Sequence, residues 1–177
     1  MTNLEDLKRS FLKNEFLTLT INGALAAHSD VYSIPSNDPR RKGLRKRIRE
    51  LLPQLAQNYV GREISGDEHV RNIESLAREL TDDFSNILYA GHFRLGTAQK
   101  LLNLYLKYCW AVGWNPEPPH GPFDDGIIKK LSLAEPIKWA KLDRVEDYSR
   151  LVEVAEKAAA DDCSIAVWEL KEWPGRG

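Results

Sequence analysis

The sequence of 177 residues is 42% hydrophobic, which is the size and composition of one globular domain with a single core. No apolar run approaches the roughly 20 residues of a membrane-spanning helix, and the N-terminal segment MTNLEDLKRSF has charges where a secretory signal has an apolar stretch. We therefore expect a single helical domain over residues 1–177, located in the cytoplasm and without a membrane partner.

The charge is unevenly distributed along the chain. Seven of the 25 basic residues lie in residues 40–49, so the remaining residues carry a net charge of −8 although the whole chain is at −1. The seven are Arg40, Arg41, Lys42, Arg45, Lys46, Arg47 and Arg49. They predict either a phosphate-binding surface, with DNA as the partner, or the solvated face of an amphipathic helix.

The first element in chain order is ambiguous. Residues 16–23, FLTLTING, alternate like a strand and end in a hairpin-type Asn-Gly pair. The segment that would pair with it, ALAAHS at residues 24–29, has poor strand propensity. We therefore interpret this region as part of an all-α fold.

Helix signals follow in regular succession. Asp38 before Pro39 predicts the start of a helix that reaches residue 59, in which Pro53 would produce a kink or a break. Ser65 begins a capping-box pattern before a helix over residues 66–80. We expect a further helix over residues 81–89.

Residues 96–112, which begin GTAQKLLNLYLKYCW, predict an amphipathic helix. At about 100° per residue its apolar residues form one broad face, which consists of Ala98, Leu101, Leu102, Tyr105, Tyr108, Cys109 and Val112. Lys100, Asn103 and Lys107 fall on the opposite face.

Lys100 is either solvent-exposed or part of a cleft. Leu104 and Ala111 are its neighbours on the helical wheel, and Trp110 lies on the opposite flank of the polar face. Such apolar neighbours would make a poor solvent face. We therefore expect this helix to be covered on more than one side, with its polar strip facing a cleft.

The next segment, residues 113–123 with the sequence GWNPEPPHGPF, is a proline-rich loop. Asp124 is the predicted N-cap of a short helix that follows this loop. Its carboxylate would be held in one orientation, so an amine at Lys100 and a carboxylate at Asp124 could act as nucleophile and base.

The C-terminal part predicts two more helices. Asp143 is expected to cap residues 145–159, and Ser164 to cap a last helix that ends at Trp173. Together, these signals predict an all-α domain of about seven to nine helices. Cys109 and Cys163 lie within apolar helical patterns and are predicted to be reduced thiols.

The motifs LGTAQK, LLNLYLKY and PFDDGII, within about residues 88–131, resemble the catalytic core of helix-hairpin-helix DNA glycosylases. They are most similar to the branch that excises oxidised guanine. The resemblance implies a glycosylase-like fold, a DNA partner and a role in DNA repair. It also implies that Lys100 attacks C1′ of the damaged nucleotide, with strand scission through a Schiff base, while Asp124 activates the lysine and stabilises the charged sugar.

Residues near this pair are candidates for binding the substrate. They are Asn103, Lys107, Trp110, Trp114 and His120, which would line a pocket for a flipped base. No metal or organic cofactor is required by this chemistry, and the four histidines lack a metal-ligand spacing. The alternative hypothesis is a helical module without enzymatic activity, which binds nucleic acid or another protein.

Overall fold

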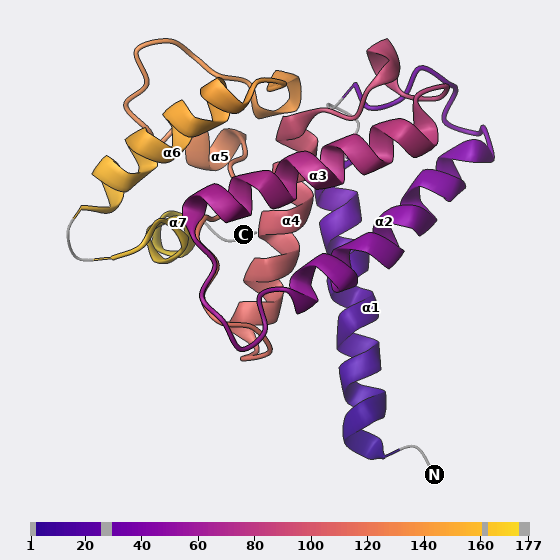
Figure 1. Cartoon of the computed structure of the whole chain (residues 1–177), viewed down its shortest axis with the longest axis horizontal. Helices are drawn as coiled ribbons and strands as arrows, with labels where there is room; N and C mark the ends of the chain where they lie inside the picture. Colours follow the sequence, from indigo (N-terminus) through magenta and orange to yellow (C-terminus); the bar gives the residue numbers. More distant parts are fainter. Residues whose placement is uncertain (1–2, 26–29, 161–162, 174–177) are drawn as a thin grey trace.

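The computed structural model describes residues 3–25, 30–160 and 163–173, and within these ranges it is compact and all-helical (Figure 1). This part of the chain forms seven α-helices and two short 3₁₀-helices. They are α1 (Leu4–Ala24), α2 (Arg40–Gln57), α3 (Gly66–Phe84), η1 (Tyr89–Gly91), α4 (Leu95–Ala111), α5 (Asp125–Ile128), η2 (Trp139–Lys141), α6 (Val145–Ala159) and α7 (Ile165–Glu172). The prediction of an all-α fold is confirmed.

Helix α4 is the centre of the fold. It packs against α1, α2 and α3, while α5, α6 and α7 form a group beside it (Figure 1). Residues on every side of α4 are buried, including Gln99 and Asn103 as well as most of the predicted apolar stripe, although Tyr108 is half-buried and Val112, which follows the helix, is exposed. The expectation that this helix is covered on more than one side is therefore confirmed, and Asn103, predicted to face a cleft, is fully buried.

The predicted helix starts agree well with the observed caps. Ser65 Oγ accepts a hydrogen bond from Glu68 N, and Ser164 Oγ accepts one from Val167 N. Asp38 Oδ1 accepts one from Arg40 N, although the helix begins one residue later than expected. These side chains satisfy backbone donors that have no partner inside the helix.

Residues 16–23 belong to α1, so their interpretation as part of an all-α fold is confirmed in spite of the strand-like pattern. Three local predictions are corrected by the structure. Helix α2 continues without a break through Pro53. Residues 81–84 belong to α3, and Leu88 forms an isolated β-bridge with Tyr32, so residues 81–89 are not a separate helix. In each case contacts with distant segments outweigh local propensity.

The third correction concerns Asp143, which does not cap α6. The N-cap of α6 is Arg144, which makes no capping bond through its side chain. The Asp143 carboxylate instead contacts His92 Nε2 at 3.0 Å and Arg94 Nε at 3.9 Å. It therefore joins the segment before α4 to the segment before α6.

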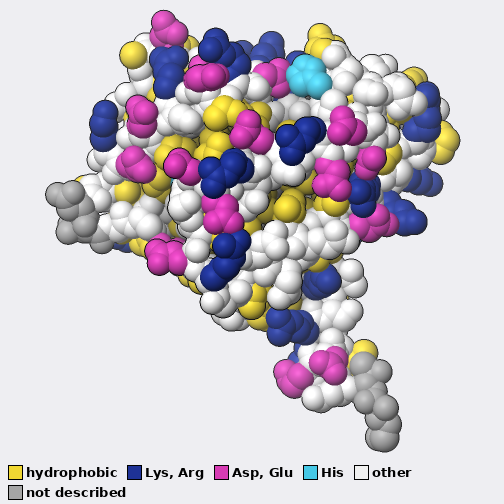
Figure 2. All heavy atoms as spheres, viewed as in Figure 1, with side chains coloured by type: hydrophobic (Ala, Val, Ile, Leu, Met, Phe, Trp, Pro, Cys, Tyr) yellow, Lys and Arg dark blue, Asp and Glu magenta, His cyan; other side chains and the backbone are white. Residues whose placement is uncertain are grey.

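The fold also shows the state of the cysteines, the membrane-spanning potential of the helices and the distribution of charge. Cys109 is buried and Cys163 half-buried, and neither forms a disulfide. Within the described ranges, no helix has the length and apolar character needed to span a membrane. Figure 2 shows basic and acidic side chains interspersed over the visible face of the molecule.

Candidate functional site

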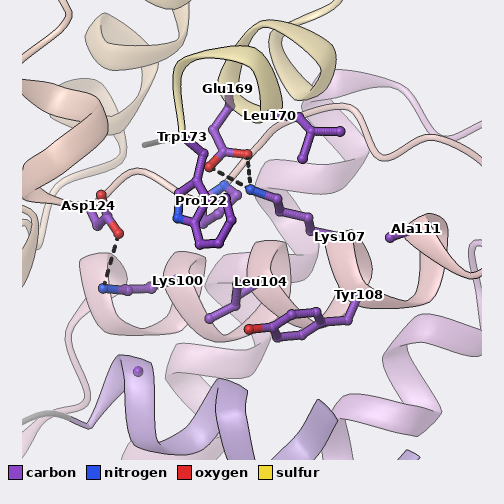
Figure 3. Close-up of a pocket in the computed structure, with 11 residues that line it drawn as sticks. Lys100, Leu104, Lys107, Tyr108, Ala111, Pro122, Asp124, Glu169, Leu170 and Trp173 are labelled. Carbon is purple, nitrogen blue, oxygen red and sulfur yellow. Dashed lines mark hydrogen bonds and ion pairs between the residues drawn. The ribbon is translucent and has the colours of Figure 1, made fainter. Parts of the chain in front are cut away.

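The Lys100 amine and the Asp124 carboxylate lie close together. Lys100 Nζ is 3.6 Å from Asp124 Oδ2, and the lysine side chain is only 12% exposed (Figure 3). Asp124 Oδ1 accepts hydrogen bonds from Gly126 N and Ile127 N at the start of α5. The cap thus orients the carboxylate so that its second oxygen faces the amine.

An aromatic ring completes the surroundings of the amine. Lys100 Nζ lies 4.2 Å from the centroid of the Trp139 ring. A cation on an indole face is stabilised by the ring quadrupole, and the adjacent carboxylate has the same effect. Both contacts stabilise the cationic form of Lys100, and nucleophilic attack from that form requires transfer of a proton to a neighbour such as Asp124.

The position of Trp139 follows from close packing at the start of α4. Gly96 N donates a hydrogen bond of 2.8 Å to Leu142 O, which ties the segment after η2 to the first turn of α4. Lys100 is one turn further along the same helix, because residues four apart share a face. The glycine therefore allows η2 to approach and to place Trp139 over the amine.

The Lys100–Asp124 pair separates two hollows. The first has a volume of about 250 Å³. Its lining is Gly23, Lys100, Leu104, Lys107, Tyr108, Ala111, Pro122, Asp124, Glu169, Leu170 and Trp173. The second has a volume of about 430 Å³ and extends past the pair to Asp125, Gly126, Lys138, Trp139, Ala140 and Lys141. A ligand in either hollow can reach the amine.

The far end of the first hollow holds a second ion pair. Lys107 Nζ contacts Glu169 Oε2 at 2.7 Å and Oε1 at 2.9 Å, and the Glu169 side chain is only 2% exposed. Burial raises the pKa of the Glu169 carboxyl, an effect opposed by the Lys107 charge. Trp173 lies between the two ion pairs, with its ring facing the hollow (Figure 3).

A buried polar network holds the proline-rich loop against α4. Asn103 Nδ2 donates to Gly121 O at 3.0 Å, and Gln99 Nε2 donates to Phe123 O at 2.7 Å. Asn103 also contacts His69 Nε2 at 2.6 Å, and His120 Nδ1 contacts the Tyr148 hydroxyl at 2.9 Å. The loop that carries Asp124 is thereby positioned relative to Lys100.

The two histidines of this network are buried and electrically neutral. Burial lowers the pKa of His69 to about 4 and that of His120 to about 3. The Tyr59 hydroxyl accepts from Asn72 Nδ2 and can therefore donate to His69 Nδ1, which leaves Nε2–H to donate to Asn103. His69 and His120 thus serve as hydrogen-bonding core residues.

The predicted substrate-binding residues are distributed over several places. Lys107 lines the first hollow, whereas Asn103 and His120 belong to the buried network. Trp114 packs against Phe16, with ring centroids 5.5 Å apart. Trp110 is half-buried on α4 but does not line the hollow.

Most of the predicted basic surface is engaged within the molecule. Arg47 contacts Glu79 and Asp83, and Arg49 NH2 donates to Thr18 Oγ1 at 2.7 Å. Further contacts join Arg40 to Asp38, Arg41 to Ile34 O and Arg45 to Asn22 Oδ1. Lys42 and Lys46 are exposed.

The sequence did not indicate the roles of Trp139, Glu169 and Trp173 at the site. Only their residue types, two aromatic rings and a carboxylate, could have drawn attention to them. Among the described residues, no group of three or more metal-ligating side chains is suited to hold a metal ion. Compared with models of known protein families, with curated proteins and with solved structures, the chain gave no match.

Proposed function

We propose that the protein is a DNA glycosylase and abasic-site lyase of the helix-hairpin-helix type, with Lys100 as nucleophile and Asp124 as its proton acceptor. The observation that carries the proposal is the 3.6 Å separation of the two groups at the junction of two hollows. The resemblance of residues 88–131 to that family supports the same assignment. We also propose that the protein is located in the cytoplasm.

The proposed reaction uses only groups of the protein, the substrate and water. Asp124 takes a proton from the Lys100 ammonium, the amine nitrogen bonds to C1′, and the bond from C1′ to the base breaks as the base leaves with the proton from Asp124. The nitrogen then loses a proton, the bond from C1′ to O4′ breaks with that proton transferred to O4′, and an imine forms. The imine allows removal of a proton from C2′ and loss of the 3′ phosphate. Hydrolysis of the imine returns the free amine.

A flipped base would enter the first hollow. Its volume of about 250 Å³ is below the range of about 300–1,000 Å³ for drug-sized ligands and suits a small planar group. Trp173 offers a ring for stacking, while Lys107 and Glu169 offer a donor and an acceptor.

The DNA phosphates would be bound by side chains. In the resembling family a hairpin with closely spaced glycines holds a phosphate through backbone amides, but here Gly96 N is bonded to Leu142 O. Lys138 and Lys141 are exposed and line the second hollow beside Lys100. We propose that they contact the phosphates next to the lesion, together with Lys42 and Lys46 on α2.

Reductive trapping tests the proposal. DNA with an abasic site or oxidised guanine is incubated with the protein and borohydride, which converts the transient imine to a stable amine adduct. We expect an adduct that mass spectrometry maps to Lys100, that is absent in Lys100→Gln and that persists in the matched surface variant Lys157→Gln. No adduct on either DNA, or an adduct on another lysine, would refute the assignment.

A second function is favoured by a specific observation. The ammonium of Lys100 is stabilised by both Asp124 and Trp139, which is also the arrangement of a binding site without covalent chemistry. In that case the protein is a non-enzymatic module that binds nucleic acid or protein. DNA binding that depends on Lys138 and Lys141 without an adduct would support this alternative.

A further inference from the structure

The N-terminal half of α1 extends beyond the other helices. Figure 1 shows this part of the helix projecting from the body of the molecule. The buried residues of α1 are Leu17, Thr20, Ile21 and Ala24, all in its C-terminal half. The first three turns therefore contribute little to the hydrophobic core.

An apolar stripe lies on this projecting segment. Leu4, Leu7 and Phe11 are 62%, 55% and 62% exposed. Their spacing of three and four residues places them on one face of the helix. Three large apolar side chains exposed together are typical of an interaction surface.

The stripe faces away from the rest of the protein. On the other side of α1, the Arg9 guanidinium lies 4.9 Å from the centroid of the Trp114 ring, and Phe16 stacks on Tyr108 at 5.2 Å. At about 100° per residue, Arg9 is roughly 160° from Phe11 around the helix axis. The body thus holds one face of the helix and leaves the apolar face to a partner.

The charges on this segment select the partner. Residues 3–15 contain three acidic and three basic side chains, Glu5, Asp6, Lys8, Arg9, Lys13 and Glu15, so the segment has no net charge. A neutral segment is not attracted to anionic lipid or to nucleic acid. It can, however, complement a second copy of itself if opposite charges meet.

Lys8 and Glu15 are arranged for this pairing. They are seven residues apart and follow the same edge of the apolar stripe. In an antiparallel pair with Phe11 near the two-fold axis, Lys8 of each copy lies opposite Glu15 of the other. A parallel pair would place this edge against the other edge of the partner's stripe, so Lys8 and Glu15 would not meet and the two ion pairs would not form.

We propose that α1 pairs antiparallel with α1 of a second copy of this chain, burying Leu4, Leu7 and Phe11 and forming two symmetric Lys8–Glu15 ion pairs. The same patch meets itself, as in other two-fold interfaces. Residues 4–15 span only about 18 Å of helix. The interface is therefore smaller than a standard one, and the dimer forms in a concentration-dependent manner.

Sedimentation velocity of the full chain at increasing concentrations tests the proposal. We expect a rapid monomer–dimer equilibrium that Phe11→Ser abolishes, while the matched variant Tyr89→Ser, which removes an exposed aromatic ring on η1, leaves it unchanged. A chain that stays monomeric at all concentrations, or a dimer that survives Phe11→Ser, would overturn the proposal.

A charge swap distinguishes the antiparallel pair from other partners. Lys8→Glu and Glu15→Lys should each weaken the dimer about tenfold, because each places like charges opposite one another twice. The double variant should restore wild-type affinity, with circular dichroism showing unchanged helix content in all variants. Failure of the double variant to restore affinity would exclude the proposed register, and binding of the monomer to phosphatidylserine vesicles would identify lipid as the partner instead.

Discussion

Gly96 lies directly against the main chain of Trp139, and a β-carbon built on Gly96 would be 1.7 Å from the Trp139 carbonyl oxygen. Real β-carbons do not approach another atom so closely, so a side chain at Gly96 would push η2 away from α4. The ring that covers the Lys100 amine would move with it. The catalytic proposal therefore depends on a glycine that makes no contact with the hollow.

The substitution Gly96→Ala tests this relationship. We expect a loss of stability of about 1–3 kcal/mol from overpacking, together with a change in tryptophan fluorescence as Trp139 moves. Urea unfolding and emission spectra measure the two effects. Gly43→Ala in α2 is the control, because its β-carbon would meet only Phe84 at 3.4 Å, and unchanged stability of both variants would contradict the close packing.

Asp124 has two roles that substitutions can separate. Asp124→Asn keeps an N-cap but removes the charge beside Lys100, whereas Asp124→Ala removes both and should cost about 1 kcal/mol of stability. If the proposed chemistry is correct, both variants lose trapping of abasic DNA although only Asp124→Ala is destabilised. Full trapping activity in Asp124→Asn would show that the carboxylate is only a cap.

The Lys107–Glu169 pair should show the asymmetry of a buried ion pair. Lys107→Met leaves the Glu169 carboxylate buried without its partner, which we expect to cost about 3–5 kcal/mol at neutral pH. Adding Glu169→Leu should recover most of this loss. Urea denaturation of the single and double variants measures the coupling between the two residues. Equal stability of the single and the double variant would mean that leaving the Glu169 carboxylate without its partner has no free-energy cost.

Acid should destabilise the protein before most carboxylates titrate. His69 and His120 have pKa values of about 4 and about 3 in the folded state and about 6.5 when unfolded. As the pH falls below 6.5 the unfolded chain binds protons that the folded chain excludes, so the free energy of unfolding decreases. Between pH 6.5 and 5 we expect a loss on the order of 1–2 kcal/mol for each histidine.

Thermal unfolding as a function of pH measures this loss. His69→Gln should reduce the slope of melting temperature against pH in that interval, even though it lowers stability at neutral pH by disturbing the network. An identical slope in the variant would mean that His69 is protonated in the folded protein.

The exposed lysines of α2 allow a test of DNA binding. We expect Lys42→Gln with Lys46→Gln to weaken DNA binding and to reduce its dependence on salt concentration, by a slope of about 0.9 for each phosphate that is no longer neutralised. Stability should not change, because these side chains are exposed. Fluorescence anisotropy at several salt concentrations measures the effect, and an unchanged, salt-insensitive curve would identify the segment as a solvated helix face.

The sequence by itself determined those features that depend on local signals. The caps at Ser65, Asp124 and Ser164, the amphipathic pattern of residues 96–112 and the prolines of residues 113–123 are local signals, and each predicted its element. Local propensity also placed Lys100 and Asp124 on a helix and at a helix start. Local signals could not show whether the seven basic residues form one surface, because Arg45, Arg47 and Arg49 contact segments that are distant in the sequence.

Only the tertiary structure decided how these parts meet. The distance between Lys100 and Asp124 depends on the loop that Asn103 and Gln99 hold by hydrogen bonds to its carbonyl groups. The positions of Trp139 and Glu169 depend on close packing of distant segments, which no local pattern encodes. Burial of the polar residues of α4 has the same cause, since a helix surrounded by others must satisfy its polar groups through residues far away in the sequence.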